Sequence, residues 1–301
     1  MRRAICGTLG TVSLLLITAA CRRPEGRAAD PQPEDRRTLA PASVSRSTPE
    51  IRRAPFQSVL PTAAAPLPAA QASPPIQCPL DRSEERAQLV RETIEKEGIR
   101  DLRVLGALQR VPRHWFVPNE VRGQAYRDRP LPIGHGQTIS QPFIVAAMTA
   151  AVAPKPTDKC LEVGTGSGYQ AAVLAELCAH TYSIEYLPEV AKLGAANLRR
   201  CGYGPNRISL RVGDGYQGWS DQAPFEVVVV TAAPERVPEP LLDQLAVAGR
   251  LVIPVGRQRL AQELELWTRL GPGKGKQALR RQHLLDVVFV PMLGQAQQEG
   301  D

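Results

Sequence analysis

Hydrophobic and polar positions are distributed unevenly along this chain, and the contrast separates two kinds of segment. From Ser83 onward, apolar residues recur at helical or strand spacing. Residues 22–80 instead are rich in Pro, Ala and Arg and show neither period. Such a segment buries too little apolar surface to fold, so we expect residues 22–80 to form a disordered leader. The pattern predicts one folded domain over residues 81–301.

Within the predicted domain, a helical section comes first and an alternation of strands and helices follows. Residues 81–150 carry mainly helical spacing, whereas residues 160–163, 181–185, 207–212 and 225–230 are short apolar runs separated by helical stretches. Continuous apolar runs are typical of strands that are buried on both faces of a parallel sheet. Two late strands, at residues 261–270 and 284–290, should close the sheet with an antiparallel edge. We therefore predict a doubly wound, Rossmann-like α/β sheet that is mostly parallel, with residues 151–301 as its core.

A glycine-rich turn follows the apolar run at residues 160–163. It reads Gly164-Thr165-Gly166-Ser167-Gly168, and a helical stretch comes next. A strand, a glycine turn and a helix together bring backbone N–H groups to a ligand at the carboxyl end of the strand. The dinucleotide fingerprint requires its third glycine three residues after the second, and that position holds Tyr169. The turn therefore disfavours NAD or FAD.

An acidic residue in register with this turn indicates what the ligand is. The run at 181–185 ends in Glu185, about 20 residues after the turn, where a doubly wound fold places the carboxylate that binds ribose hydroxyls. A glycine turn followed by such an acid resembles the pattern of S-adenosylmethionine methyltransferases. The resemblance implies S-adenosylmethionine as the cofactor and assigns these cofactor positions: Glu162, Gly164, Thr165, Gly166, Ser167, Glu185, Asp214, Gly215 and Thr231.

The candidate chemistry lies in residues 136–142, which read Gly-Gln-Thr-Ile-Ser-Gln-Pro. Thr138 and Ser140 supply hydroxyl groups, and Pro142 suits the first turn of a helix. Ser140 can cap that helix, and a capped N-terminus is itself an anion site, so the two roles are compatible. His135 stands just before this stretch and is more simply interpreted as a loop residue than as a general base.

Together with the motifs at 213–215 and 230–233, these residues make positions 84–293 similar to the protein-L-isoaspartate O-methyltransferase family. The resemblance implies methyl transfer from S-adenosylmethionine to the α-carboxyl of L-isoaspartyl residues in damaged proteins and peptides, which starts repair through a succinimide. It places Ser140 in the active site with Thr138 beside it. We expect isoaspartyl proteins and peptides as substrates, no metal ion and a monomeric chain.

Two other functions remain open from the sequence. One is a methyltransferase that acts on a small molecule or RNA, and the other is an exported lipoprotein binding module with a vestigial cofactor site. The chain carries a formal net charge of +7, but ten arginines and five acids in residues 1–80 account for five of these charges. Because the basicity belongs mostly to residues 1–80, we expect no nucleic-acid partner.

Residues 1–21 resemble a bacterial lipoprotein signal. Arg2 and Arg3 precede an apolar run at residues 9–20, and Cys21 follows two alanines. Thr18 departs from the pattern, which usually has leucine there. A membrane partner is expected only if Cys21 is lipidated. Because S-adenosylmethionine is a cytoplasmic metabolite, we expect the cytoplasm, with a cell-envelope lipoprotein as the alternative.

The six cysteines of the chain form no C-x-x-C pair and no recognisable metal or disulfide pattern. Cys160, Cys178 and Cys201 stand in or beside predicted strands and helices. We expect the cysteines to be small buried thiols.

Overall fold

The structure is a computed structural model that describes residues 78–79, 81–258, 260–273 and 278–294. The chain divides into two units, Met1–Thr48 and Pro49–Asp301, and every described residue belongs to the second unit. The predicted signal segment lies outside the described residues, as does the predicted leader except for Cys78 and Pro79. Among the helices of the described part, none combines the length and the apolar character needed to cross a membrane.

The domain begins with the helical section that the spacing predicts. It comprises α1 (Ser83–Leu89), the π-helix η2 (Val90–Ile94), α2 (Leu102–Arg110) and the 3-10 turns η3 (Arg113–Trp115) and η4 (Asn119–Gln124). Asp101 caps α2 because its carboxylate accepts hydrogen bonds from the N–H groups of Arg103 and Val104. Phe116 is fully buried and packs edge-on against Tyr169, which directly follows the glycine turn. The helical section is thereby anchored to the main sheet.

A hairpin and a long helix connect this section to the sheet. Strands β1 (Leu131–Gly134) and β2 (Gln137–Ile139) pair antiparallel, and α3 (Pro142–Val152) follows with its proline in the first turn. The hairpin turn carries three consecutive residues with positive φ, namely Gly134, His135 and Gly136. His135 is thus an exposed turn residue, as its position in the sequence suggests.

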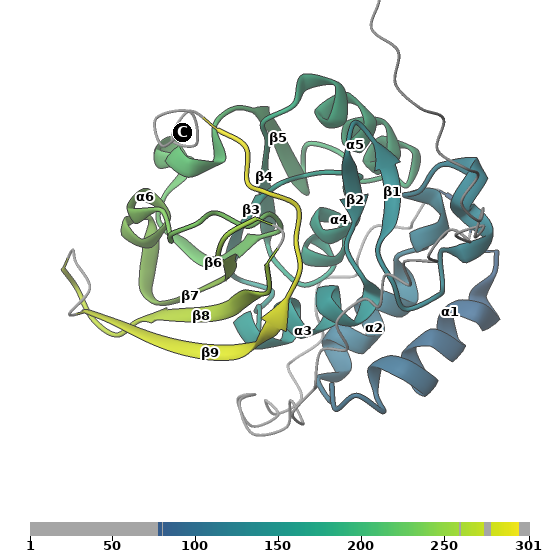
Figure 1. Ribbon diagram of the computed structural model, residues 1–301, viewed down its shortest axis with the longest axis horizontal. Helices are drawn as coiled ribbons and strands as arrows, with labels where there is room; N and C mark the ends of the chain where they lie inside the picture. The colour runs from purple at the N-terminus through teal and green to yellow at the C-terminus, as the bar shows by residue number, and fades with distance from the viewer. Residues whose placement is uncertain (1–77, 80, 259, 274–277, 295–301) are drawn as a thin grey trace, which may run out of the picture. The chain divides into compact units, whose positions relative to one another are not determined.

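The main sheet has seven strands in the order β5-β4-β3-β6-β7-β8-β9 (Figure 1). The strands are β3 (Lys159–Val163), β4 (His180–Glu185), β5 (Ile208–Val212), β6 (Phe225–Val230), β7 (Leu245–Val255), β8 (Gln262–Arg269) and β9 (Leu279–Val287). Strands β3 to β7 pair in parallel, and β8 and β9 are antiparallel. The predicted fold class is confirmed, although the last strand starts five residues earlier than the pattern predicts.

Alternation of buried side chains explains how the sheet is covered on both faces. Val227 and Val229 of β6 join the core that includes α3, α4 (Tyr169–Ala175) and α5 (Pro188–Arg200). Val228 and Val230 face the opposite core, which includes α6 (Glu239–Asp243). Chain order reverses on either side of β3, which makes its carboxyl end the topological switch point where doubly wound folds bind ligands.

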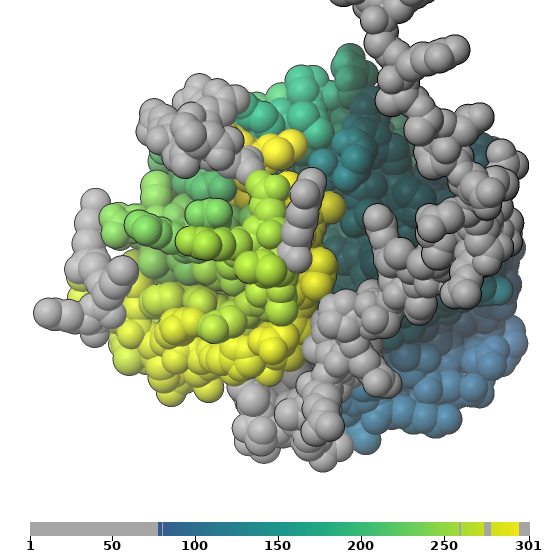
Figure 2. Space-filling model, viewed as in Figure 1, coloured from purple at the N-terminus to yellow at the C-terminus, as the bar shows by residue number. Residues whose placement is uncertain are grey.

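The segment after β9 returns to this switch point, as the yellow trace in Figure 1 shows. The N–H group of Ala233 donates to the carbonyl of Val290 at 2.9 Å, and the N–H group of Met292 donates to the carbonyl of Ala233 at 2.9 Å. The Tyr216 hydroxyl donates to the Met292 carbonyl at 3.2 Å. Residues 290–293 are therefore held beside the ends of β3 and β6. Figure 2 shows this yellow segment beside the teal surface of the hairpin region.

Four of the six cysteines form two disulfides, so the expectation of free thiols is wrong for these four. Cys78 pairs with Cys201, and Cys160 pairs with Cys178, at Cα–Cα distances of 4.4 and 6.4 Å. Cys160 lies in β3 and Cys178 follows α4, so this bridge closes the strand, glycine turn and helix into one loop. The pairing of Cys78 with Cys201 spans 123 residues and cannot be inferred from local spacing.

Candidate active site

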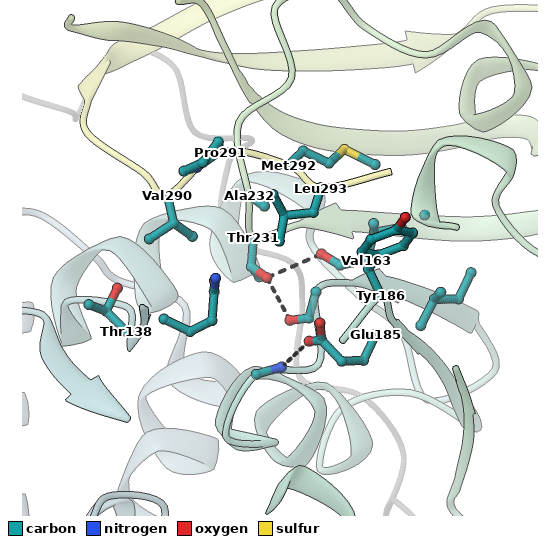
Figure 3. Close-up of a pocket in the computed structure, with 15 residues that line it drawn as sticks. Thr138, Val163, Glu185, Tyr186, Thr231, Ala232, Val290, Pro291, Met292 and Leu293 are labelled. Atoms are coloured by element: carbon teal, nitrogen blue, oxygen red, sulfur yellow. Dashed lines mark hydrogen bonds between the residues drawn. The ribbon is translucent and has the colours of Figure 1, made fainter. Parts of the chain in front are cut away.

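A cleft of about 540 Å³, open to solvent, lies at the carboxyl ends of β3, β4 and β6. Figure 3 shows that the lining residues come mainly from the hairpin, from three strand ends and from the returning C-terminal segment, and Gly215 comes from the turn after β5. They are Gln137, Thr138, Val163, Gly164, Gly166, Ile184, Glu185, Tyr186, Gly215, Thr231, Ala232, Val290, Pro291, Met292 and Leu293.

The glycine turn adopts a backbone that other residues rarely adopt. Gly164, Gly166 and Gly168 have φ values of 97°, 54° and 89°, in the region where an L side chain is strained. At Gly164 an added Cβ atom would lie 2.5 Å from the Thr231 hydroxyl. At Gly168 it would lie 2.8 Å from a side-chain carbon of Leu198 in α5. The sequence therefore needs glycine here for both conformation and close packing.

Glu185 stands at the tip of β4 and projects its carboxylate to the edge of the cleft. One carboxylate oxygen accepts a hydrogen bond from the Gly166 N–H group at 2.9 Å (Figure 3). The other accepts from the Leu187 N–H group at 3.0 Å. Only 8% of Glu185 is exposed. The acid is thus fixed in place beside the glycine turn, where the sequence pattern predicts it.

Thr231 joins the ends of the two central strands. Its hydroxyl lies 2.7 Å from the Gly164 carbonyl and 3.1 Å from the Val163 carbonyl, and both oxygens can accept its proton. Because the Thr231 N–H group also donates to the Val163 carbonyl at 2.9 Å, the floor of the cleft is rigidly connected.

Three of the predicted cofactor residues, Glu162, Thr165 and Ser167, lie beneath the cleft and do not line it. Ser183 connects two of them, because its hydroxyl donates to Glu162 and lies 2.5 Å from the Thr165 hydroxyl. The Ser167 carbonyl accepts from the Asn197 amide at 3.0 Å. These residues hold the turn from below.

Glu162 is fully buried, and this burial raises the pKa of its carboxyl to about 8, with the negative charge of Glu185 adding to the shift. Glu162 is therefore largely protonated at neutral pH. Its second oxygen has no hydrogen-bond partner among the described residues.

Asp214 and Gly215 occupy different positions relative to the cleft. Gly215 lines it, and an added Cβ atom there would lie 2.4 Å from a Val163 side-chain carbon. Asp214 caps the 3-10 turn η5 (Gly215–Gln217) by accepting a hydrogen bond from the Tyr216 N–H group at 2.9 Å. The structure thus gives Asp214 a role in shaping the turn that presents Gly215.

Thr138 lies across the cleft from Glu185 (Figure 3), whereas Ser140 is not among the residues that line the cleft. Thr138 lines the cleft, and Ser140 lies two residues further along the same extended segment, partly buried. Ile139 between them is buried, so strand alternation places both hydroxyls on the opposite face. The suggestion that Ser140 caps α3 is wrong, because Gln141 is the N-cap residue and the Phe143 N–H group donates to Asp128 at 2.8 Å. Within the described residues the Ser140 hydroxyl has no hydrogen-bond partner.

Sequence reasoning missed several lining residues. Tyr186 directly follows Glu185, so its place beside the acid follows from the strand end. Residues 290–293 carry no comparable signal, because only long-range hydrogen bonds to Ala233 and Tyr216 bring them to the cleft.

Comparison with known proteins gives a consistent result. The family model of Protein-L-isoaspartate(D-aspartate) O-methyltransferase matches residues 84–297. The chain is 51% identical over 211 residues to a Protein-L-isoaspartate O-methyltransferase of Gloeobacter violaceus, covering 70% of this chain and 100% of the relative. It is 52% identical over 210 residues to the Opitutus terrae protein of the same name, covering 70% and 87%.

A solved structure shows the same fold. The crystal structure named for a protein-L-isoaspartate O-methyltransferase from Plasmodium falciparum, in complex with S-adenosyl-L-homocysteine, matches with a TM-score of 0.59. The two sequences are 24% identical, and the match covers 69% of this chain and 98% of that chain.

Proposed function

Because the chain belongs to the protein-L-isoaspartate(D-aspartate) O-methyltransferase family, we propose that its cleft is where the family's reaction takes place. The enzyme uses S-adenosylmethionine to methylate the α-carboxyl of L-isoaspartyl residues in damaged proteins and peptides, which initiates repair through a succinimide. Residues 81–150 form the proposed substrate section, and residues 151–301 form the proposed cofactor core. Family membership speaks against the small-molecule, RNA and binding-module alternatives.

The geometry of the cleft supports a specific assignment for the cofactor. Glu185 presents a fixed carboxylate suited to ribose hydroxyls. Gly164 and Gly215 leave space that a side chain would fill. Glu162, Thr165 and Ser167 act indirectly in this assignment by holding the turn, and Thr231 holds the floor. S-adenosylmethionine supplies the electrophilic methyl group when it is bound.

The substrate carboxyl needs orientation more than activation. A carboxyl of this type has a pKa of roughly 3–4, so it is ionised at neutral pH and requires no general base. Thr138 and Ser140 can donate hydrogen bonds to it without neutralising its charge. Correct alignment of reacting groups can contribute about 7–11 kcal/mol. A lysine or arginine at this place would stabilise the ground-state charge that the reaction consumes.

The observation that carries this assignment is the Ser140 hydroxyl, which has no hydrogen-bond partner among the described residues and lies two positions after Thr138, a residue that lines the cleft. The test compares Ser140→Ala with Ser220→Ala, an exposed serine remote from the cleft. We expect Ser140→Ala to lower kcat at least tenfold and to leave the Kd for S-adenosylmethionine unchanged. Ser220→Ala should change neither kcat nor this Kd. A methylated Ser140 in quenched turnover would show instead that this residue is a covalent intermediate.

We also propose that the chain works as a monomer. Light scattering during size-exclusion chromatography tests this. A dimer whose dissociation abolishes activity would contradict it.

A further proposal concerns the compartment. Two disulfides persist in an oxidising environment and are rare in the cytoplasm. Together with the lipoprotein-like residues 1–21, they favour the cell envelope over the cytoplasm. Fractionation of cells that express the wild-type chain or Cys21→Ser tests this, with alkylation of free thiols before lysis. Wild-type protein found in the cytoplasm with Cys160 and Cys178 alkylated would contradict the proposal.

A further inference from the structure

Asp128 lies between η4 and β1, outside the cleft, and its carboxylate makes two hydrogen bonds to the segment after Ser140. One oxygen accepts from the backbone N–H group of Phe143 at 2.8 Å. The other accepts from the side-chain amide of Gln141 at 2.7 Å. The carboxylate therefore holds both the first turn of α3 and the residue that immediately follows Ser140.

This arrangement replaces the usual local cap of a helix. The first N–H groups of a helix need an acceptor, and a serine just before the helix is a common one. Ser140 stands one residue before the N-cap Gln141, and the acceptor for the Phe143 N–H group is Asp128, 15 positions away in the chain. The start of α3 is thus held without any hydrogen bond from Ser140, whose hydroxyl has no partner among the described residues.

We propose that Asp128 is a positioning residue for methyl transfer, which fixes the start of α3 so that Thr138 and Ser140 present their hydroxyls to the substrate carboxyl. The inference rests on the proposed roles of Thr138 and Ser140. It adds a residue that touches neither substrate nor cofactor and acts through the backbone of the segment at 138–143.

A buried cation gives this carboxylate a counter-charge. Arg113 is fully buried, and its side-chain Nε donates to the Ala125 carbonyl at 2.9 Å. Its two terminal nitrogens have no hydrogen-bond partner among the described residues. Burial lowers the pKa of Arg113 to about 10, while the charges of nearby groups, Asp128 among them, oppose this shift. Arg113 also stacks on Tyr169, the first residue of α4, at 4.9 Å from the ring centroid. The negative charge of Asp128 therefore favours the charged form of Arg113.

The test uses the full chain and separates geometry from stability. Asp128→Ala removes both hydrogen bonds. Asp128→Asn keeps an oxygen for Phe143 and can donate to Gln141 after the amide of Gln141 rotates. The matched control is Asp101→Ala, which removes an aspartate cap from α2 in the same helical section. Measurements are kcat and KM with an isoaspartyl peptide, the Kd for S-adenosylmethionine, and the melting temperature.

We expect Asp128→Ala to lower kcat by up to about 100-fold, the loss that a displacement of about 1 Å can cause, with little change in the Kd for S-adenosylmethionine. Asp128→Asn should recover most of kcat, because it can keep both hydrogen bonds. Asp101→Ala should lower the melting temperature and leave kcat unchanged.

A double-mutant cycle with Ser140→Ala shows whether Asp128 acts through the hydroxyl. If it does, Asp128→Ala should cost much less kcat when Ser140 is already absent. If Ser140→Ala lowers kcat but Asp128→Ala does not, or if the two losses multiply fully, the positioning role is refuted and the proposed function stands. If Ser140→Ala leaves kcat unchanged, the proposed role of Ser140 fails, and this inference fails with it.

Discussion

Replacement of Gly164 by alanine perturbs the connection between the glycine turn and the central strand β6. Gly164 has a φ of 97°, and its added Cβ atom would lie 2.5 Å from the Thr231 hydroxyl oxygen. That hydroxyl cannot move away without cost, because it is held at 2.7 Å from the Gly164 carbonyl and 3.1 Å from the Val163 carbonyl. The substitution therefore both strains the backbone and breaks the two hydrogen bonds of the Thr231 hydroxyl.

The two contributions can be separated with a second glycine. A non-glycine residue in this backbone region costs about 1–3 kcal/mol, and the lost hydrogen bonds add about 1 kcal/mol each. Gly134 has nearly the same backbone angle, with a φ of 94°, but a Cβ atom there meets nothing within 4 Å. Gly134→Ala should therefore show the strain alone. We expect Gly164→Ala to be about 2 kcal/mol less stable than Gly134→Ala.

Urea unfolding followed by circular dichroism measures this difference, and calorimetry measures S-adenosylmethionine binding. Because Gly164 also lines the cleft, we expect its alanine variant to raise the Kd at least tenfold, or about 1.4 kcal/mol, while Gly134→Ala leaves it unchanged. Equal stabilities and equal affinities for the two variants would refute the argument that Thr231 makes glycine necessary at position 164.

Three further predictions follow from the buried and lining groups. Glu185→Gln should raise the Kd for S-adenosylmethionine about 10–100-fold by calorimetry, since hydrogen bonds to a charged group contribute about 1.5–3 kcal/mol; an unchanged Kd would contradict this. The folded pKa of Glu162 is raised to about 8, so its native state keeps a proton that the unfolded chain loses near pH 4.3. The free energy of unfolding of the wild-type chain should therefore fall as the pH rises from about 4.3 to about 8, by up to about 1.4 kcal/mol per pH unit. In urea unfolding, Glu162→Gln should not show this fall in the free energy of unfolding with pH. The same pH dependence in the variant and the wild type would refute the prediction. Cys160→Ala should lower stability by about 3 kcal/mol, as the loss of an 18-residue disulfide loop implies; this difference should vanish in dithiothreitol, and a persistent gap would point to lost packing instead.

Local pattern was sufficient to predict the sheet and the position of the glycine turn and Glu185 at the cleft. The apolar run of β6 and the glycines at 164, 166 and 168 each occupy the predicted place, because their requirements are set by neighbours in sequence. Glu185 was predictable for the same reason, since a strand end fixes where its last side chain points. The fold class and the location of the cleft follow from these features.

Long-range contacts were not predictable in this way. Residues 290–293 reach the cleft only through hydrogen bonds to Ala233 and Tyr216. The partner of Phe143 could not be foreseen either, because Asp128 is 15 residues away and Ser140 offers a plausible local cap. The bond between Cys78 and Cys201 joins residues 123 positions apart. In each case the contact joins residues that are far apart in sequence and meet only in the tertiary fold.

The most direct test of the central claim is methylation of matched peptides. The purified chain is incubated with tritiated-methyl S-adenosylmethionine and two peptides that differ only in an isoaspartyl or an aspartyl linkage. We predict base-labile label on the isoaspartyl peptide alone. Equal labelling of both peptides, or labelling of neither by a chain that binds S-adenosylmethionine, would contradict the assignment of this cleft to isoaspartyl methylation.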